Sequence, residues 1–187
     1  MRNYDEGKTA DTSIKNVFLS GRPGIGKTTT LQRAVDLIPG EADGFTTREV
    51  REGRRRVGFM IEDLQGESAV MAHVDVSGPV RVSKYGVDVD AIERIGAAAL
   101  RRAVAGGSLA VVDEVGKMEL ACPAFVNALM ELLDAPVPVL GTMHTREDSV
   151  THSIRSRADT RVLHLTKANR EEMPARLCAM VAELRAR

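Results

Sequence analysis

The sequence predicts an α/β fold of three layers, in which a mostly parallel sheet is covered by helices on both faces. Three observations predict it. Short apolar runs of strand length alternate along the chain with segments of helical periodicity. A glycine-rich turn joins the first apolar run to the first helix, and a later apolar run ends in two adjacent acids. Such alternation is typical of parallel sheets with both faces covered.

The bulk composition indicates one ordinary globular domain. The chain has 187 residues, of which 43% are hydrophobic, and its formal net charge is +0. We expect residues 1–13, which are polar, to form a flexible tail ahead of a single domain over residues 14–187. The balanced charge argues against nucleic acid as a partner. No apolar segment reaches the roughly 18 residues of a membrane span, and no signal peptide is evident, so a cytoplasmic location is expected.

The first half of the chain predicts a strand, a helix and an antiparallel excursion. Residues 17–19 suit a buried strand, and a helix runs from Lys27 to the stop at Pro39-Gly40. Three β-like segments then form an antiparallel excursion after this first helix: 44–51, 56–64 and 68–74. A helix follows over residues 87–107, with Asp90 and Glu93 as its capping box.

The second half returns to alternating strands and helices. The strand that begins at Leu109 is followed by a helix over residues 123–133 and by a strand over residues 137–143. A short helix is predicted at 148–156 and a strand at 160–165. Asn169 and Glu172 are expected to cap a C-terminal helix that reaches about Ala186. In such sheets the ligand binds at the carboxyl ends of the strands.

The glycine-rich turn matches the phosphate-binding pattern G-x-x-x-x-G-K-[ST]. Its glycines let successive backbone N–H groups point inward, and the positive end of the following helix adds to this anion site. Lys27 would reach the β- and γ-phosphates, and the Thr28 hydroxyl would bind Mg²⁺. We therefore predict that nine residues bind the nucleotide: Gly21, Arg22, Pro23, Gly24, Ile25, Gly26, Lys27, Thr28 and Thr29.

Two acids end the strand "LAVVDE" and divide the expected chemistry between them. Asp113 stands where P-loop proteins hold Mg²⁺ with the aspartate that ends a second strand. Glu114 is then placed to orient a water molecule in line with the γ-phosphate and to take its proton. The predicted metal ligands are thus Thr28 and Asp113, and the predicted catalytic residues are Glu114 and Lys27. Lys117 and Glu119 fit a surface ion pair as well as they fit a functional role.

Other residues are weaker candidates. Thr142 or His144, at the carboxyl end of the strand over residues 137–143, could contact the γ-phosphate or the attacking water. Tyr85 could contact the base or ribose with Lys84 near the phosphates, and a tyrosine packed on the sheet fits equally well. Hydrolysis also calls for a cation on the developing γ-phosphate charge. The sequence does not choose among five arginines for this role: Arg22, Arg48, Arg146, Arg155 and Arg157.

The segments "FLSGRPGIGKTT", "GFTTREVREGRRRVGF", "VSKYGVDVDAIE", "AVVDEVGKMEL" and "PVLGTMH" occur in this order. Together they resemble the small P-loop nucleoside-triphosphatases of the thermophilic-enzyme type, the group that includes cancer-related nucleoside-triphosphatase. The resemblance implies a RecA-like sheet and slow, Mg²⁺-dependent hydrolysis of nucleoside triphosphates such as ATP and GTP, with little base preference. It assigns the role of base to Glu114. It assigns phosphate and metal binding to five residues: Gly24, Gly26, Lys27, Thr28 and Asp113. Arg22 departs from the family, which usually has proline or a small residue there.

Three functional hypotheses remain open at this point. The first is a nucleoside-triphosphate phosphohydrolase. The second is a kinase for a nucleotide or a small molecule, whose only candidate lid is the segment 146–157. The third is a nucleotide-gated regulatory switch. A kinase would place phosphate on an added acceptor, whereas a switch would bind a partner differently in its di- and triphosphate states.

Overall fold

The computed structural model describes residues 14–186, so the tail expected at residues 1–13 lies outside the described part of the chain. A sheet of nine strands forms its centre, in the order β5-β6-β4-β3-β2-β7-β8-β1-β9. The strands run as follows: β1 Asn16–Ser20, β2 Ala42–Glu52, β3 Arg55–Asp63, β4 Ser68–His73, β5 Arg81–Val82, β6 Tyr85–Val87, β7 Leu109–Val115, β8 Val139–Met143 and β9 Thr160–His164.

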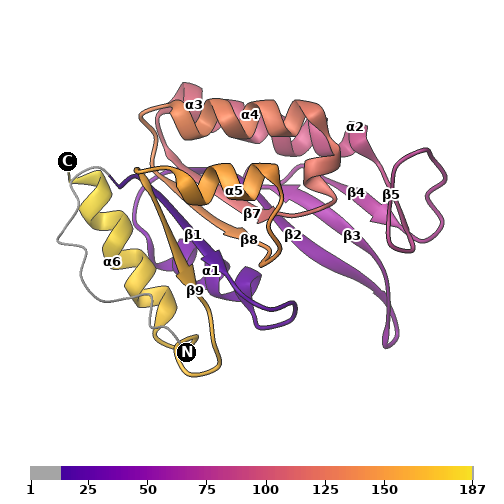
Figure 1. Ribbon diagram of the computed structural model, residues 1–187, viewed down its shortest axis with the longest axis horizontal. Coiled ribbons are helices and arrows are strands. Elements are labelled where there is room, and N and C mark those ends of the chain that lie inside the picture. Colours follow the sequence, from indigo (N-terminus) through magenta and orange to yellow (C-terminus); the bar gives the residue numbers. More distant parts are fainter. Residues whose placement is uncertain (1–13, 187) are drawn as a thin grey trace.

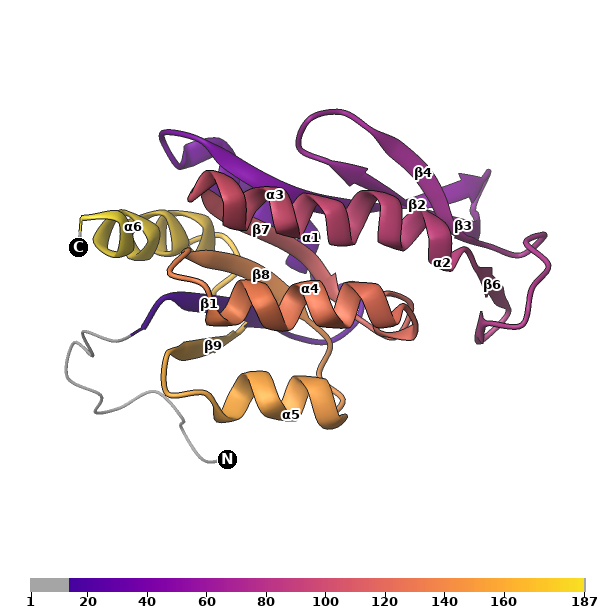
Figure 2. The ribbon, with the colours of Figure 1, turned by 90° about the horizontal axis from the view of Figure 1, so that it is seen from above.

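Helices cover both faces of the sheet (Figure 1). Helices α3, α4 and α5 lie on one face and α1 and α6 on the other, and the second view separates these layers (Figure 2). The long helices are α1 Lys27–Leu37, α3 Ala98–Gly106, α4 Pro123–Asp134, α5 Ser149–Ser156 and α6 Met173–Arg185. Three short helical segments complete the set: α2 Val89–Ala91, a π-helical turn at Ile92–Ala97 and a 3₁₀ turn at Glu119–Ala121. The predicted three-layer α/β class is confirmed.

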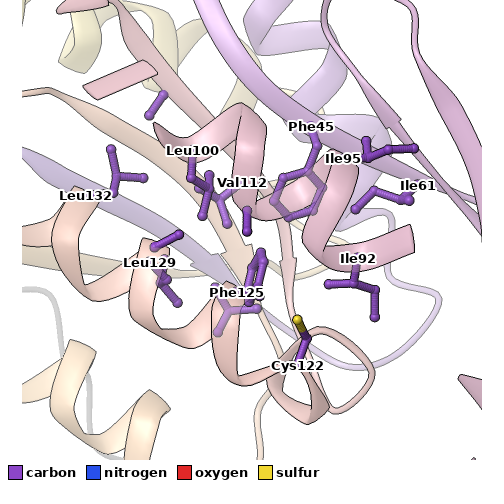
Figure 3. Packing of buried hydrophobic residues seen from close by; sticks show 14 of the residues in the cluster. Phe45, Ile61, Ile92, Ile95, Leu100, Val112, Cys122, Phe125, Leu129 and Leu132 are labelled. Atoms are coloured by element: carbon purple, nitrogen blue, oxygen red, sulfur yellow. The ribbon is translucent and has the colours of Figure 1, made fainter. Parts of the chain in front are cut away.

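Five strands form the parallel part of the sheet, from β2 through β7, β8 and β1 to β9. Strands β1 and β8 are buried along their whole length, because helices cover both of their faces. On the α3–α4 face, Phe45 of β2 and Phe125 of α4 meet edge to face inside the larger core cluster (Figure 3). On the other face, Leu31 of α1 and Leu177 of α6 pack on β1 and β8.

The antiparallel excursion is present and is longer than predicted. Strand β2 belongs to both parts of the sheet: Ala42–Phe45 pair in parallel with β7, and the remainder pairs antiparallel with β3. Strands β3 and β4 follow as expected, and β6 and β5 then extend the sheet to its edge. The sequence analysis did not predict β5 and β6, because strands of two and three residues carry too little periodicity to be recognised.

Two predicted helix caps are wrong. The helix predicted over residues 87–107 starts from Asp88, whose side chain accepts a hydrogen bond from the Ala91 N–H, so Asp90 and Glu93 form no capping box. Glu172 is the N-cap of α6 but makes no side-chain capping bond. Asn169 instead closes the preceding turn through the N–H of Thr166. Asp88 thus satisfies an N–H in the first turn of its helix, whereas Asn169 satisfies an N–H of the turn before α6.

None of the helices within residues 14–186 is long and apolar enough to cross a membrane.

Candidate active site

The glycine-rich loop lies between the carboxyl end of β1 and the start of α1, as the sequence predicts. Gly24 and Gly26 have φ angles of 74° and 106°, a region that only glycine adopts without strain. The N–H of Ile25 donates to the carbonyl of Arg22 at 3.2 Å, which closes the turn. Gly26 is the N-cap of α1 and makes no side-chain cap. The free N–H groups of the first turn are therefore available to an anion.

Lys27 is the first residue of α1, and its side chain turns back toward the loop. The ammonium donates to the carbonyl of Gly21 at 3.4 Å. It also lies 3.4 Å from Oε1 of Glu114, in an ion pair in which only 9% of the lysine side chain is exposed. The positive partner of the acidic pair in β7 is thus Lys27, and it meets Glu114 rather than Asp113. A nearly buried ammonium at this point is suited to forming charge-assisted hydrogen bonds with an anion.

A bulge in β7 places the two acids. Between the pairs Val112–Gly141 and Val115–Met143, β7 has one residue more than β8. Asp113 and Glu114 occupy this irregular stretch, and the peptide bond between them is cis. A bulge breaks the strict alternation of side chains between the two faces of a strand, and bulges occur often beside active sites. The backbone thus directs both carboxylates to the edge where the loop lies.

Asp113 is 0% exposed, and threonines surround its carboxylate. Oδ1 accepts hydrogen bonds from the hydroxyl of Thr28 at 3.1 Å and from that of Thr142 at 2.7 Å. Oδ2 accepts from the N–H of Thr47 at 3.3 Å and from its hydroxyl at 3.4 Å. Burial raises the pKa of Asp113 above its ordinary value, and the hydrogen bonds from the threonines act against this rise. Hydrogen bonds thus fix the carboxylate in position, and no cation within residues 14–186 forms an ion pair with it.

Thr47 is a site residue that the sequence analysis missed. It was assigned to the antiparallel excursion, and the parallel pairing of the first part of β2 with β7 was not foreseen. That pairing ends at Phe45 and Val112, so Thr47 comes to lie beside Asp113 at the carboxyl ends of the two strands. The available signal was a pair of threonines directly after a buried Gly-Phe step.

Glu119 does not form the surface ion pair that was one of its two expected roles. It is buried in the 3₁₀ turn after β7, whereas Lys117 is exposed. Burial raises the pKa of Glu119 to about 8, and the nearby charges of Glu114 and Asp113 add to this effect. Hydrogen bonds from its own N–H and from that of Gly116 act in the opposite direction. The site therefore holds a third carboxyl group that is protonated at neutral pH.

His144 follows β8 directly and lies at the same edge of the sheet. Its N–H donates to the carbonyl of Val115 at 3.4 Å. Its Nε2 lies 3.0 Å from Oδ2 of Asp148, without hydrogen-bond geometry, and only 17% of the side chain is exposed. Thr142, the other candidate on this strand, bonds Asp113 instead of being free for a phosphate. The two residues predicted as alternatives thus occupy different surroundings.

The structure separates the candidate arginines. Arg22 and Arg146 are exposed, and Arg48 is an exposed partner of Glu62. Arg157 binds Asp134 and Asp159. The carbonyl of Asp159 accepts the N–H of Asn16, so this cluster lies at the amino end of β1, away from the loop.

Tyr85 lies in the antiparallel part of the sheet, packed edge to face on Phe59 at a centroid distance of 5.3 Å. Its hydroxyl accepts a hydrogen bond from Arg56, and Lys84 bonds the carbonyl of Arg56. Of the two roles considered for Tyr85, the packed one agrees with this placement. Neither Tyr85 nor Lys84 contacts the glycine-rich loop in any hydrogen bond or ion pair of the described residues.

The residues at this edge suit magnesium. The hydroxyl of Thr28 and the carboxylate of Asp113 are both hard oxygen donors and lie within hydrogen-bond distance of each other. Within residues 14–186 no cluster of three or more histidine, cysteine or acidic side chains could hold a metal by itself. Mg²⁺ usually binds one or two carboxylates together with water and substrate phosphates.

The strand–loop–helix unit, with an aspartate at the end of the parallel strand β7, which β8 separates from β1, defines a P-loop nucleotide-binding protein. Residues 16–178 match the family model described as NTPase. The chain therefore belongs to the NTPase family, and its enzyme class is nucleoside-triphosphatase.

Relatives and solved structures agree with this membership. Nucleoside-triphosphatase THEP1 of Thermofilum pendens is 41% identical, over 94% of this chain and 100% of the relative. The cancer-related nucleoside-triphosphatase homolog of Bos taurus is 38% identical, over 85% of this chain and 92% of its own. The crystal structure of THEP1 from Aquifex aeolicus superposes with a TM-score of 0.82 at 28% identity, covering 88% of this chain and 98% of that one. The solution structure of a human cancer-related nucleoside triphosphatase superposes with a TM-score of 0.76 at 34% identity, covering 89% of this chain and 97% of that one.

Proposed function

We propose that this chain is a Mg²⁺-dependent phosphohydrolase that converts a nucleoside triphosphate and water into the diphosphate and phosphate. The observation that carries the proposal is the arrangement of two pairs at one edge of the sheet. Lys27 lies beside Glu114, and Thr28 lies beside Asp113. Phosphate binding and proton transfer each need one of these side chains, metal binding needs two, and all four lie together.

Each side chain has one task in this reaction. The loop N–H groups and Lys27 bind the phosphates, while Thr28 and Asp113 hold Mg²⁺, which when bound neutralises charge on the β- and γ-oxygens. Glu114 accepts the proton of the attacking water as the new O–P bond forms and the bond to the bridging oxygen breaks. Because Lys27 and Glu114 pair with each other, this ion pair opens before either acts. We therefore expect slow turnover.

We propose that the enzyme accepts ATP, GTP and other triphosphates. Base selectivity commonly uses stacking on an aromatic ring, and the aromatic residues among those described are engaged elsewhere. Phe18, Phe45 and Phe125 are completely buried, while Phe59 and Tyr85 pack on each other. We also propose a cytoplasmic location, because Cys122 and Cys178 are both free thiols.

The test is phosphate release across a panel of nucleoside triphosphates by the wild type and Glu114→Gln. The variant keeps the shape of the side chain and loses the base, so we expect it to bind triphosphate and to lose turnover by about 10²- to 10⁴-fold. Glu131→Gln, at an exposed acid of α4, is the matched control and retains wild-type rates. Wild-type turnover in Glu114→Gln would show that the base is another residue. Phosphate found on an added acceptor instead of in solution would favour a kinase.

A further inference from the structure

Hydrolysis of a triphosphate builds negative charge on the γ-phosphate and on the leaving diphosphate. P-loop enzymes meet this charge with a cation besides the loop lysine, often an arginine. In this chain the side chain with the required position is Arg155, on α5. It is half-buried, and within residues 14–186 it makes no ion pair with a carboxylate.

The guanidinium of Arg155 lies across the ends of two adjacent core strands. Its Nη2 donates to Oγ of Ser20 at 3.1 Å and to the carbonyl of His144 at 3.4 Å. Ser20 is the last residue of β1 and precedes the glycine-rich loop, and it pairs in register with Met143 at the end of β8. The arginine thus approaches the loop from the sheet face opposite α1, next to the strand whose Thr142 bonds Asp113.

The hydrogen-bond partners of Arg155 are neutral groups. This distinguishes it from Arg157, another candidate, whose partners include carboxylates. That arginine is held by two carboxylates, and exchanging them for phosphate would break two ion pairs. Arg155 would exchange only a hydroxyl and a carbonyl for charged oxygens, which form stronger bonds with a guanidinium. Its present contacts hold the side chain near the site without neutralising its charge.

A second observation concerns the same place. Both ring nitrogens of His144 are hidden from solvent and, within the described residues, neither has a hydrogen-bond partner. Buried polar atoms without a hydrogen-bond partner are uncommon in proteins, which indicates that a further partner binds here. The carbonyl of this residue is one of the two acceptors of Arg155. The end of β8 therefore carries both a carbonyl that accepts from Arg155 and a ring whose nitrogens lack hydrogen-bond partners within the described residues, with Nε2 3.0 Å from the carboxylate of Asp148.

Helix α5 holds the arginine in place. Asp148 accepts hydrogen bonds from the N–H groups of Val150 and Thr151, and the hydroxyl of Thr151 accepts the N–H of Asp148 in return. This capping box fixes the start of α5. Ile154, next to Arg155, is fully buried and anchors the last turn of the helix in the core.

We propose that Arg155 is the cation that binds the γ-phosphate during hydrolysis, supplied by the same chain from α5. The proposal rests on the placement of the triphosphate in the glycine-rich loop described above. As water adds to the γ-phosphorus and the bond to the bridging oxygen breaks, the guanidinium stabilises the charge on the γ-oxygens. The side chain distinguishes tri- from diphosphate, because only the triphosphate carries the group that it contacts.

The test compares Arg155→Ala and Arg155→Lys with Arg146→Ala, an exposed arginine after the same strand. Measurements are kcat for ATP and calorimetric affinity for ADP and for a non-hydrolysable ATP analogue. We expect Arg155→Ala to lose about 10²- to 10³-fold in kcat and to bind the analogue more weakly, with ADP affinity within about twofold of wild type. Arg155→Lys, which keeps the stem and a charge, loses less, and Arg146→Ala retains the wild-type values. Guanidinium added to Arg155→Ala restores part of the rate.

A purely structural role gives a different pattern. If Arg155 only ties β1 to β8, Ser20→Ala would reproduce the loss in kcat, added guanidinium would restore nothing, and ADP would bind as poorly as the analogue. Any of these results, or a kcat of Arg155→Ala within about threefold of wild type, overturns the proposal. Failure of the proposed function looks different again, since the wild type itself would then release no phosphate from any triphosphate.

Discussion

The same aromatic contact occurs twice in this molecule, once in each half of the sheet. In the parallel half, Phe45 and Phe125 meet edge to face with centroids 5.6 Å apart. In the antiparallel half, Phe59 and Tyr85 meet at 5.3 Å and at the same interplanar angle of 75°. The first pair is completely buried. In the second pair Tyr85 is buried but Phe59 is only partly buried, with the guanidinium of Arg56 4.9 Å from the centre of the Phe59 ring.

The two halves also treat charge differently. The parallel half buries the carboxyl groups of Asp113 and Glu119 at its strand ends. The antiparallel half has exposed charge pairs, such as Glu49 with Arg51 and Arg56. Exposed pairs contribute little to stability, whereas a buried carboxyl group costs free energy unless it is satisfied or protonated. Asp63, at the end of β3, is also buried, but the guanidinium of Arg102 lies 2.7 Å from its carboxylate, whereas within residues 14–186 no cation forms an ion pair with Asp113 or Glu119.

The largest expected effect comes from comparing the removal of one lysine in each half of the sheet. Lys27→Ala removes the nearly buried ammonium at the loop, so we expect weak nucleotide binding and a loss of turnover of at least about 10³-fold. Lys84→Ala, in the antiparallel half, removes a cation that bonds the carbonyl of Arg56 and lies over Tyr85, and turnover stays at the wild-type rate. Phosphate release and calorimetric titration with ATP measure both variants. A comparable loss in Lys84→Ala would place the triphosphate nearer to the antiparallel half.

The aromatic pairs provide the second comparison. Phe125→Ala opens a cavity in the main core, and we expect it to lower the free energy of unfolding by about 3–5 kcal/mol. Phe59→Ala removes a ring that is only partly buried, so we expect a loss of about 1–2 kcal/mol. Urea denaturation of both variants measures the difference. Equal losses would mean that the antiparallel half is as tightly packed as the parallel core.

The sequence predicted the parallel half better than the antiparallel half, for physical reasons. Its strands and helices are long enough to show periodicity, and the glycine-rich loop combines a fixed spacing with a strand before and a helix after it. The short β5 and β6 carry no such pattern. Within the site, Asp113 and Glu114 were recognised from their place after an apolar run. Thr47 was missed because its role depends on a pairing between strands far apart in the sequence.

The burial of Glu119 was likewise beyond the sequence. The sequence places Glu119 four residues after a strand, a position that is usually at the surface. The 3₁₀ turn buries its side chain and brings it near Glu114 and Asp113. Residue type predicts what a side chain can do, and tertiary contacts decide whether it is charged.

The last comparison concerns this carboxyl group and distinguishes the halves by a pH dependence of stability. Because the pKa of Glu119 is raised to about 8 in the folded protein, folding takes up a proton between pH 4.5, near its unfolded pKa, and pH 8. The group therefore makes the free energy of unfolding fall as pH rises through this window, by at most about 1.4 kcal/mol per pH unit. Glu119→Gln removes this slope. Denaturation at a series of pH values from 5 to 9 measures it.

Glu49→Gln in the antiparallel half is the matched control. Burial acts to raise the pKa of Glu49, but hydrogen bonds from Arg56 and Arg51 outweigh it and lower the pKa. Its stabilising contribution is thus present above its unfolded pKa and is lost only as pH falls through the lower folded pKa, outside the measured range. The curve of Glu49→Gln should therefore run parallel to that of the wild type from pH 5 to 9. If the curve of Glu119→Gln also runs parallel, Glu119 is ionised in the folded protein, and the site carries one more negative charge beside Glu114 than we infer.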